Sequence, residues 1–301
     1  PLRSKHDVIG ILYATKAKEY GFDQDDREML QAFANQATVA IDNARLVKES
    51  IEKERLEQEL KVAQDTQMRL LPKQMPRIEH LDVDAFCLTA TEVGGDYFDL
   101  IKLDEHRLGV VIADVSGKGL SAAFYMAELK GIVNAVAKLT NSPQKLLQQV
   151  NQILFATMDR KTFVSMIYAI FDMKKKRITY CRAGHGPLIH FSSEHELTTF
   201  LQPKGIGVAL DGGRIFDSEL EEAEIMWKKD DFFVFFTDGL NEARNASLEE
   251  YGDERILQSL NISRGKSAGD IQKAILEDVS NFMGDAKRHD DLSIIVVKSC
   301  S

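Results

Sequence analysis

Four short segments of the chain place an aspartate beside an apolar run, a glycine or a second acid, at residues 94–99, 113–119, 236–239 and 289–292. Continuous apolar strands are usually interior. A carboxylate at the end of such a strand is costly to desolvate unless it is paired or bound to a metal. No basic partner for these acids is obvious in the sequence, and converging aspartates would repel one another. Because oxygen-only ligation suits Mg²⁺ or Mn²⁺, the pattern predicts a divalent-cation site.

Each of these aspartates alone could instead cap a turn, as aspartate often does. The recurrence of four such sites in one stretch of chain favours metal binding. The loop at 116–121 is not a phosphate loop, because position 112 is not glycine and Gly119 follows Lys118. Residues 94–98 (Gly-Gly-Asp-Tyr-Phe) are similar to the signature of diguanylate cyclases. His185 is interpreted as a turn or sheet-packing residue, and His289 as orienting a turn rather than binding metal.

The elements that must position the acids are read from apolar runs separated by glycine turns. The sequence predicts strands at 83–90, 97–103, 108–113, 163–172, 177–183, 188–191, 232–236 and 292–297. It predicts helices at 121–139, 143–157, 248–261 and 268–283. Strands occur in consecutive pairs and so do helices, which favours an α+β fold with antiparallel sheets over repeated βαβ units.

The N-terminal part has a different pattern. A strand is expected at 7–15, followed by a helix that Asp23 caps and that continues to Pro72, since no Gly or Pro interrupts it after Gly21. Its apolar residues form an imperfect heptad pattern, with a jump across polar Gln67, that suits a two-stranded coiled coil. The alternative is a single solvated helix held by ion pairs four residues apart.

Composition limits the function classes. The chain has 301 residues and a net charge of −9, which argues against a non-specific nucleic-acid binder. It contains no apolar run long enough to span a membrane, no signal peptide and only three scattered cysteines, so a cytoplasmic location is expected. Because it begins with Pro1, we expect a fragment of a longer protein.

Taken together, the acidic motifs resemble those of bacterial PPM (PP2C-like) serine/threonine phosphatases of the sporulation and stress-response type, the SpoIIE/RsbU type. The resemblance covers about residues 66–301. It rests on Leu-Leu-Pro at 70–72 and on residues 93–99, 113–123, 183–187, 237–243 and 290–293, all in the family's order. Residues 1–45 resemble the last strand and helix of a GAF sensor domain. The expected division is therefore 1–44, a GAF remnant; 45–76, a helical coiled-coil linker; and 77–301, the phosphatase domain.

The phosphatase resemblance implies two stacked antiparallel sheets flanked by helices and holding two Mn²⁺ or Mg²⁺ ions. Asp114 would bridge both ions and the Val115 carbonyl would bind the first. Asp96 would act on the first site, directly or through water, and Asp238 and Asp290 would complete the second. Asp291 stays an alternative to Asp290, because the doubled acid leaves the register open. The family's larger relatives often carry a histidine where this loop has Ser116 and Lys118, which leaves the general acid open.

The hypothesis is a metal-dependent phosphatase acting on phosphoserine or phosphothreonine. By resemblance, its substrate would be a phosphorylated anti-sigma-factor antagonist of the STAS type. An upstream sensor would control it through the helix at 42–71, within a homodimer formed by the linker. Two alternatives stay open: a nucleotide cyclase of the diguanylate type that uses Asp96 as a metal ligand, and a catalytically weak binding module.

Overall fold

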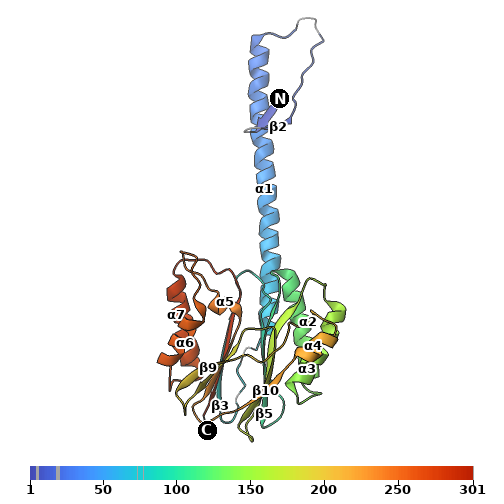
Figure 1. Ribbon diagram of the computed structural model, residues 1–301. Helices are drawn as coiled ribbons and strands as arrows, with labels where there is room; N and C mark the ends of the chain where they lie inside the picture. Colours follow the sequence, from blue (N-terminus) through green and yellow to red (C-terminus); the bar gives the residue numbers. More distant parts are fainter. Residues whose placement is uncertain (5–6, 18–20, 73, 77, 301) are drawn as a thin grey trace. The chain divides into compact units, whose positions relative to one another are not determined.

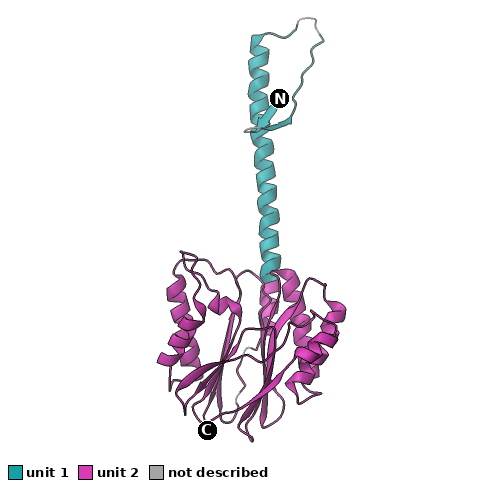
Figure 2. Cartoon of the chain, viewed as in Figure 1, with its two compact units in different colours: residues 1–62 teal, residues 63–301 magenta. Residues whose placement is uncertain are grey.

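The computed structural model describes residues 1–4, 7–17, 21–72, 74–76 and 78–300. The chain divides into two compact units, Pro1–Val62 and Ala63–Ser301 (Figure 2). Residues 77 and 301, the predicted ends of the phosphatase domain, lie outside the described residues.

The first unit holds two short antiparallel strands and most of one long helix. Strand β1 (Leu2–Ser4) pairs with β2 (Asp7–Gly10), so the strand expected at 7–15 is shorter than predicted. Helix α1 (Gln24–Leu70) begins after Asp23, whose carboxylate accepts the amide proton of Asp26 at 2.9 Å. This confirms the predicted cap, and the helix ends before Pro72 as expected.

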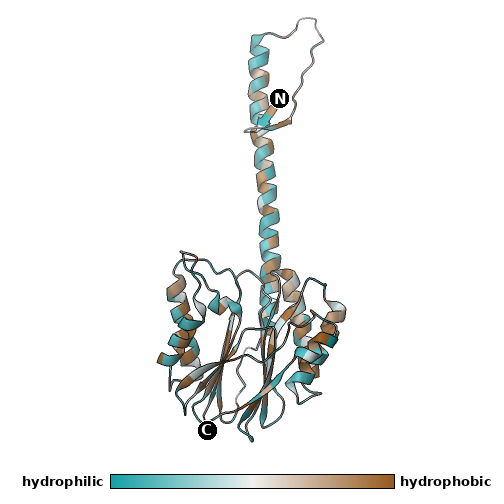
Figure 3. Ribbon diagram, in the orientation of Figure 1, coloured by the Kyte–Doolittle hydropathy of each residue, from teal (hydrophilic) through white to brown (hydrophobic). Residues whose placement is uncertain are grey.

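Much of α1 is polar, with apolar residues spread along it (Figure 3). Within the first unit, many of these apolar side chains are exposed: Met29, Phe33, Val39, Ile41, Leu46, Val47, Ile51, Leu56 and Val62. A helix with so little buried surface in its own unit is marginal by itself. In the described parts of the chain, no helix combines the length and apolar character needed to cross a lipid bilayer.

The second unit is built on two five-stranded antiparallel sheets (Figure 1). The first sheet has the order β10-β7-β6-β5-β4 and contains Glu222–Met226, Arg177–Ala183, Val164–Asp172, Arg107–Val115 and Tyr97–Lys102. The second has the order β3-β12-β11-β8-β9 and contains Leu81–Leu88, Leu292–Ser299, Phe232–Phe236, Leu188–Ser192 and Leu197–Leu201.

Helices cover the outer face of each sheet (Figure 1). Helices α2 (Leu120–Val136) and α3 (Pro143–Thr157) pack on the first sheet, with the short α4 (Arg214–Glu219) beside α3. Helices α6 (Gly252–Ile262) and α7 (Ala268–Met283) cover the second, and α5 (Asp238–Asn241) follows β11 directly. One apolar cluster fills the first sheet's helical side and the space between the sheets, while another lies under α6 and α7. The α+β prediction with two stacked antiparallel sheets is confirmed.

The sequence missed three strands and two short helices. Strand β1, in the first unit, is only three residues long. Strands β9 and β10 lie at sheet edges and are largely half-buried or exposed, so they lack the continuous apolar run that marks the interior strands. Helices α4 and α5 are too short to show helical periodicity. Helix α6 begins at Gly252 rather than at 248.

Candidate metal centre

The predicted acids lie at one end of the sheets because of where the strands begin and end. Asp96 directly precedes β4, and Asp114 is the penultimate residue of β5. Because Tyr97 pairs with Ala113 in the antiparallel ladder, Asp96 and Asp114 lie opposite each other at the ends of the two strands. In the second sheet, Asp238 follows β11 and Asp290 precedes β12. Antiparallel pairing of β11 with β12 brings the end of one to the start of the other.

Side chains connect the two sheets at this end. The hydroxyl of Thr237, which follows β11, donates to Asp96 Oδ2 at 2.8 Å. Asp291 accepts the amide protons of Ala90 at 2.7 Å and Gly95 at 2.8 Å, one on each carboxylate oxygen. Both Asp291 oxygens therefore hold the backbone of other segments in place, whereas Asp290 accepts the amide of its neighbour Asp291 at 3.0 Å on Oδ1 and the Lys118 ammonium on Oδ2.

The electrostatics are those of several acids sharing a small, poorly solvated space. Burial, and then the charge of Asp114, raise the pKa of Asp96 well above its ordinary value. Burial raises the pKa of Asp114 to about 7, with further contributions from Asp238, Asp290 and Asp291. The pKa of Asp238 is also raised, by burial and by Asp290. Such groups strongly favour a cation nearby.

Two of the acids have basic partners, Asp99 with Lys130 at 2.7 Å and Asp290 with Lys118, which corrects the expectation drawn from the sequence. Lys118, in the loop between β5 and α2, places its ammonium 2.8 Å from Asp290 Oδ2. Its charge opposes the rise in the pKa of Asp114 and of Asp238. The sequence did not show this pairing because Asp290 lies on a distant segment, before β12.

The donor set has the chemistry of a site for a hard divalent cation, since every predicted ligand supplies oxygen. Gly95 lies so close to β5 that an added Cβ would be 2.6 Å from the Val115 carbonyl oxygen and 3.1 Å from Asp114 Oδ1. A side chain at position 95 would thus fill the space beside two predicted ligands. Among the residues that the structure describes, no three His, Cys, Asp or Glu side chains lie so that they could hold a metal ion as they stand. The residues therefore fit the cation by donor type and charge, without a preformed coordination shell.

Gln67 is a site residue that the sequence analysis did not predict. It lies in the last turns of α1 within the second unit and is 6% exposed. Its side chain donates to the Gly94 carbonyl at 2.6 Å and accepts from the Gly94 amide at 3.1 Å. The sequence offered one signal for this role: Gln67 is a polar residue at a position where the spacing of the helix calls for an apolar one.

His185 is a structural residue, as predicted. Its Nε2 lies 3.0 Å from the Phe236 carbonyl and its Nδ1 2.7 Å from the Ser165 hydroxyl. Because a carbonyl can only accept, Nε2 carries the proton and Nδ1 accepts from Ser165. Burial lowers the pKa of His185 to about 4, so the ring is neutral at pH 7. The histidine connects β6 of one sheet to β11 of the other.

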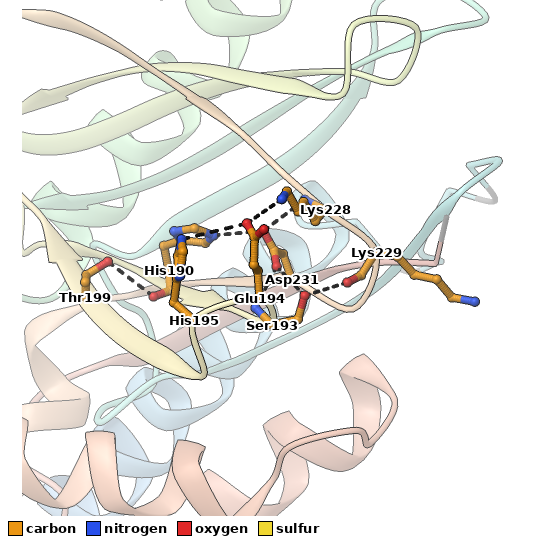
Figure 4. Close-up of polar contacts among 8 residues, drawn as sticks. All are labelled: His190, Ser193, Glu194, His195, Thr199, Lys228, Lys229 and Asp231. Atoms are coloured by element: carbon orange, nitrogen blue, oxygen red, sulfur yellow. Dashed lines mark hydrogen bonds and ion pairs between the residues drawn. The ribbon is translucent and has the colours of Figure 1, made fainter.

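A second polar cluster lies at the opposite end of β11 (Figure 4). His190 Nε2 is 3.2 Å from Asp231 Oδ2, and the Ser193 hydroxyl lies 2.8 Å from Asp231 Oδ1 and 2.7 Å from the Lys229 carbonyl. Burial raises the pKa of Asp231, but the hydrogen bonds from His190, the Lys228 amide and Ser193 outweigh this and keep it below its ordinary value. The serine hydroxyl is directed at the carboxylate and a carbonyl, so the cluster anchors the β8–β9 turn rather than forming a nucleophile.

Comparisons with known proteins show which families the two parts of the chain match. The family described as Stage II sporulation protein E (SpoIIE) matches residues 104–299, and the GAF domain family matches residues 1–41. Phosphoserine phosphatase RsbU of Bacillus subtilis (strain 168) is 30% identical over 248 residues, which cover 81% of this chain and 70% of RsbU.

Two solved structures share the fold. The SiaA-PP2C domain of Pseudomonas aeruginosa has a TM-score of 0.71 at 16% identity and covers 82% of this chain and 98% of that one. RsbX, solved in complex with magnesium, has a TM-score of 0.57 at 19% identity and covers 75% of this chain and 98% of that one. At these identities the likeness concerns the fold alone.

Proposed function

Since this chain belongs to the SpoIIE family and has a PP2C-like fold, we propose that it is a metal-dependent phosphatase acting on phosphoserine or phosphothreonine in a protein. One observation carries the proposal. Four aspartates from two sheets, Asp96, Asp114, Asp238 and Asp290, are gathered at one end of the fold, and three of them have raised pKa values. The similarity to RsbU, named a phosphoserine phosphatase, supports the substrate class.

Each of these residues would have its own role in binding metal. Asp114, between the ladder partner Asp96 and the acids of the second sheet, would bridge two Mn²⁺ or Mg²⁺ ions, and the Val115 carbonyl would bind the first. Asp238 and Asp290 would hold the second ion. Both oxygens of Asp291 tie distant backbone segments together, whereas the partners of Asp290 are the amide of its neighbour and the exposed Lys118. Bound ions of this kind lower the pKa of water and balance phosphoryl charge.

The protein's own contribution would be to hold the loop that carries Asp96 against the second sheet. Thr237 donates to Asp96, and Asp291 holds the Gly95 amide, so the loop at 94–96 is tied to the second sheet. His185 joins β6 to β11 just before Asp238. These bonds would limit how far the loop at 94–96 moves when a cation and the substrate bind.

The finer assignments are also proposals. We propose a division into 1–44, 45–76 and 77–301, with a phosphorylated STAS-type antagonist as substrate and control by an upstream sensor. The bonds from Gln67 to Gly94 support this control, because they join the last turns of α1 to the loop that carries Asp96. A change in the position of these turns would alter the metal site.

A homodimer through α1 is proposed from the exposed apolar residues of that helix. Replacing Leu60 with Asp places a charge in the predicted seam. We expect the Leu60→Asp chain to sediment as a monomer and to show altered basal activity. If both oligomeric state and activity match those of the unmodified chain, the linker proposal is wrong.

The test of the main proposal is phosphate release from a phosphoserine peptide or a phosphorylated STAS protein, with and without Mn²⁺. Release should require Mn²⁺ and disappear in Asp114→Asn. Formation of a cyclic dinucleotide from GTP instead would favour the cyclase alternative. Mn²⁺ binding seen by calorimetry without release from either substrate would favour a binding module.

A further inference from the structure

Lys118 contacts the aspartate cluster from outside the predicted ligand set. Its ammonium donates to Asp290 Oδ2 at 2.8 Å and also to the carbonyl oxygen of His289. Both acceptors belong to the segment before β12, whereas Lys118 comes from the loop after β5. A single ammonium therefore joins two of the loops that carry predicted metal ligands.

The same ammonium acts on other acids of the centre. Its charge stabilises the ionised forms of Asp114 and Asp238, although burial and neighbouring carboxylates dominate at both. One monovalent charge cannot balance Asp114, Asp238 and Asp290 together. A divalent cation carries twice the charge. In the assignment proposed above it would bind Asp290, where Lys118 holds Oδ2 and the backbone amide of Asp291 donates to Oδ1.

The loop around Lys118 is suited to releasing it. Gly117 and Gly119 flank the residue with φ values of 98° and 76°, and an added Cβ at either would meet nothing within 4 Å. The lysine side chain is 55% exposed. Its ammonium can thus leave Asp290 without disturbing packed residues, at the end of a long and flexible stem.

We propose that Lys118 is an internal counter-ion that competes with divalent cation for Asp290, and that the displaced ammonium then binds the phosphate of the substrate. This inference rests on the proposed phosphatase function. Lys118 would then affect the two affinities in opposite directions. Its ion pair with Asp290 weakens the binding of metal, and its freed charge strengthens the binding of phosphate.

The test is calorimetric titration of the full chain with MnCl₂, followed by titration of the Mn²⁺-saturated protein with inorganic phosphate. Lys118→Met keeps the length of the side chain and removes its charge. We expect it to bind Mn²⁺ about fivefold more tightly and phosphate about fivefold more weakly, as suits the loss of one exposed ion pair. Lys118→Arg should stay close to the unmodified chain in both titrations.

The matched control is Lys273→Met on α7, which removes the same charge from an exposed lysine 3.8 Å from Glu277. It should leave both affinities unchanged. An equal gain in Mn²⁺ affinity in this control, or no gain in Lys118→Met, overturns the inference. The proposed function is tested separately, on the unmodified chain. If that chain binds Mn²⁺ and releases phosphate from its substrate, the proposed function stands whatever the Lys118 variants show. If it does neither, the proposed function fails.

Discussion

The side chain of Gln67 bonds both polar groups of one backbone residue, the carbonyl of Gly94 at 2.6 Å and its amide at 3.1 Å. Gly94 lies two residues before Asp96, so a buried glutamine at the end of α1 sets the position of a predicted metal ligand. The relationship belongs to the second unit alone, since that unit begins at Ala63.

Gln67→Leu should therefore damage both stability and activity. The variant keeps the volume of the side chain but leaves the amide and carbonyl of Gly94 without their partner, which costs about 1–3 kcal/mol for a buried group. Urea unfolding and Mn²⁺-dependent phosphate release would measure the two effects. Gln64→Leu is the control, because its bond to Thr89 is long, at 3.5 Å, and its loss should cost little. Equal effects of the two variants would contradict this role for Gln67.

Position 94 should tolerate no side chain. A Cβ there would be 1.9 Å from Asp291 Oδ2, and the Asp291 carboxylate cannot move away without losing the amides of Ala90 and Gly95. We expect Gly94→Ala to destabilise the fold by about 1–3 kcal/mol and to abolish activity. Gly131→Ala in α2 is the matched change, since a Cβ there meets nothing within 4 Å.

Gly131→Ala should stabilise the protein by about 0.5–1 kcal/mol, because alanine loses less backbone entropy than glycine in a helix. Thermal unfolding of the two variants beside the unmodified chain separates the effects. A Gly94→Ala variant as stable and active as the Gly131→Ala variant would show that the loop at 94–96 is free to move.

The acidic motifs and the interior strands were predictable because each is local in sequence. The runs ending near Asp114 and Asp238 are apolar throughout, and such runs indicate buried strands directly. The roles of Asp290 and Asp291 were not separable, because the distinction depends on which backbone amides reach each carboxylate. Those amides belong to Ala90 and Gly95, about two hundred residues away along the chain.

The same limit explains Lys118 and Gln67. The sequence shows a lysine between two glycines and a glutamine on a polar helix, and neither residue type points to a partner. Each acquires its role only when the β5–α2 loop meets the segment before β12, or when α1 meets the segment before β4. The edge strands β9 and β10 were missed for a related reason, since their exposed positions carry little apolar signal.

His185 predicts a specific pH dependence of stability. Its pKa of about 4 in the folded state lies below the value of about 6.5 for an unfolded chain, so acid protonates the unfolded chain first. The stability from the neutral ring is complete above pH 6.5 and is lost as the pH falls from 6.5 to 4. The loss could reach about 3 kcal/mol.

Urea unfolding of His185→Gln at pH 7.5, 5.5 and 4.5 tests this. The variant should be less stable than the unmodified chain at pH 7.5, and the gap should shrink towards pH 4.5. His195→Gln is the control, because the side chain of His195 is 71% exposed and its loss should change stability little at any pH. A gap for His185→Gln that stays constant with pH would mean that burial does not hold the ring neutral.

The buried Asp99 and the half-buried Asp114 should respond in opposite directions to the same substitution. Asp114 lies among acids that repel it, whereas Asp99 has its own partners, Lys130 at 2.7 Å and Asn134 at 3.0 Å. In the presence of a metal chelator at pH 8, Asp114→Asn removes a half-buried charge that neighbouring acids oppose and should stabilise the fold by about 1–2 kcal/mol. Asp99→Asn leaves the Lys130 ammonium without its counter-charge and should destabilise it by about 1–3 kcal/mol.

The two variants should rank the other way round in activity, with Asp99→Asn active and Asp114→Asn inactive. Asp114→Asn should abolish Mn²⁺-dependent phosphate release while its melting temperature in chelator rises, because acids gathered for a cation weaken the fold that carries them. Asp99→Asn should keep activity at temperatures where it stays folded, since its contacts lie within β4 and α2. A lower melting temperature for Asp114→Asn in chelator would show that its neighbours support the charge instead of opposing it. The case for a cation at this end of the sheets would then lose its main physical argument.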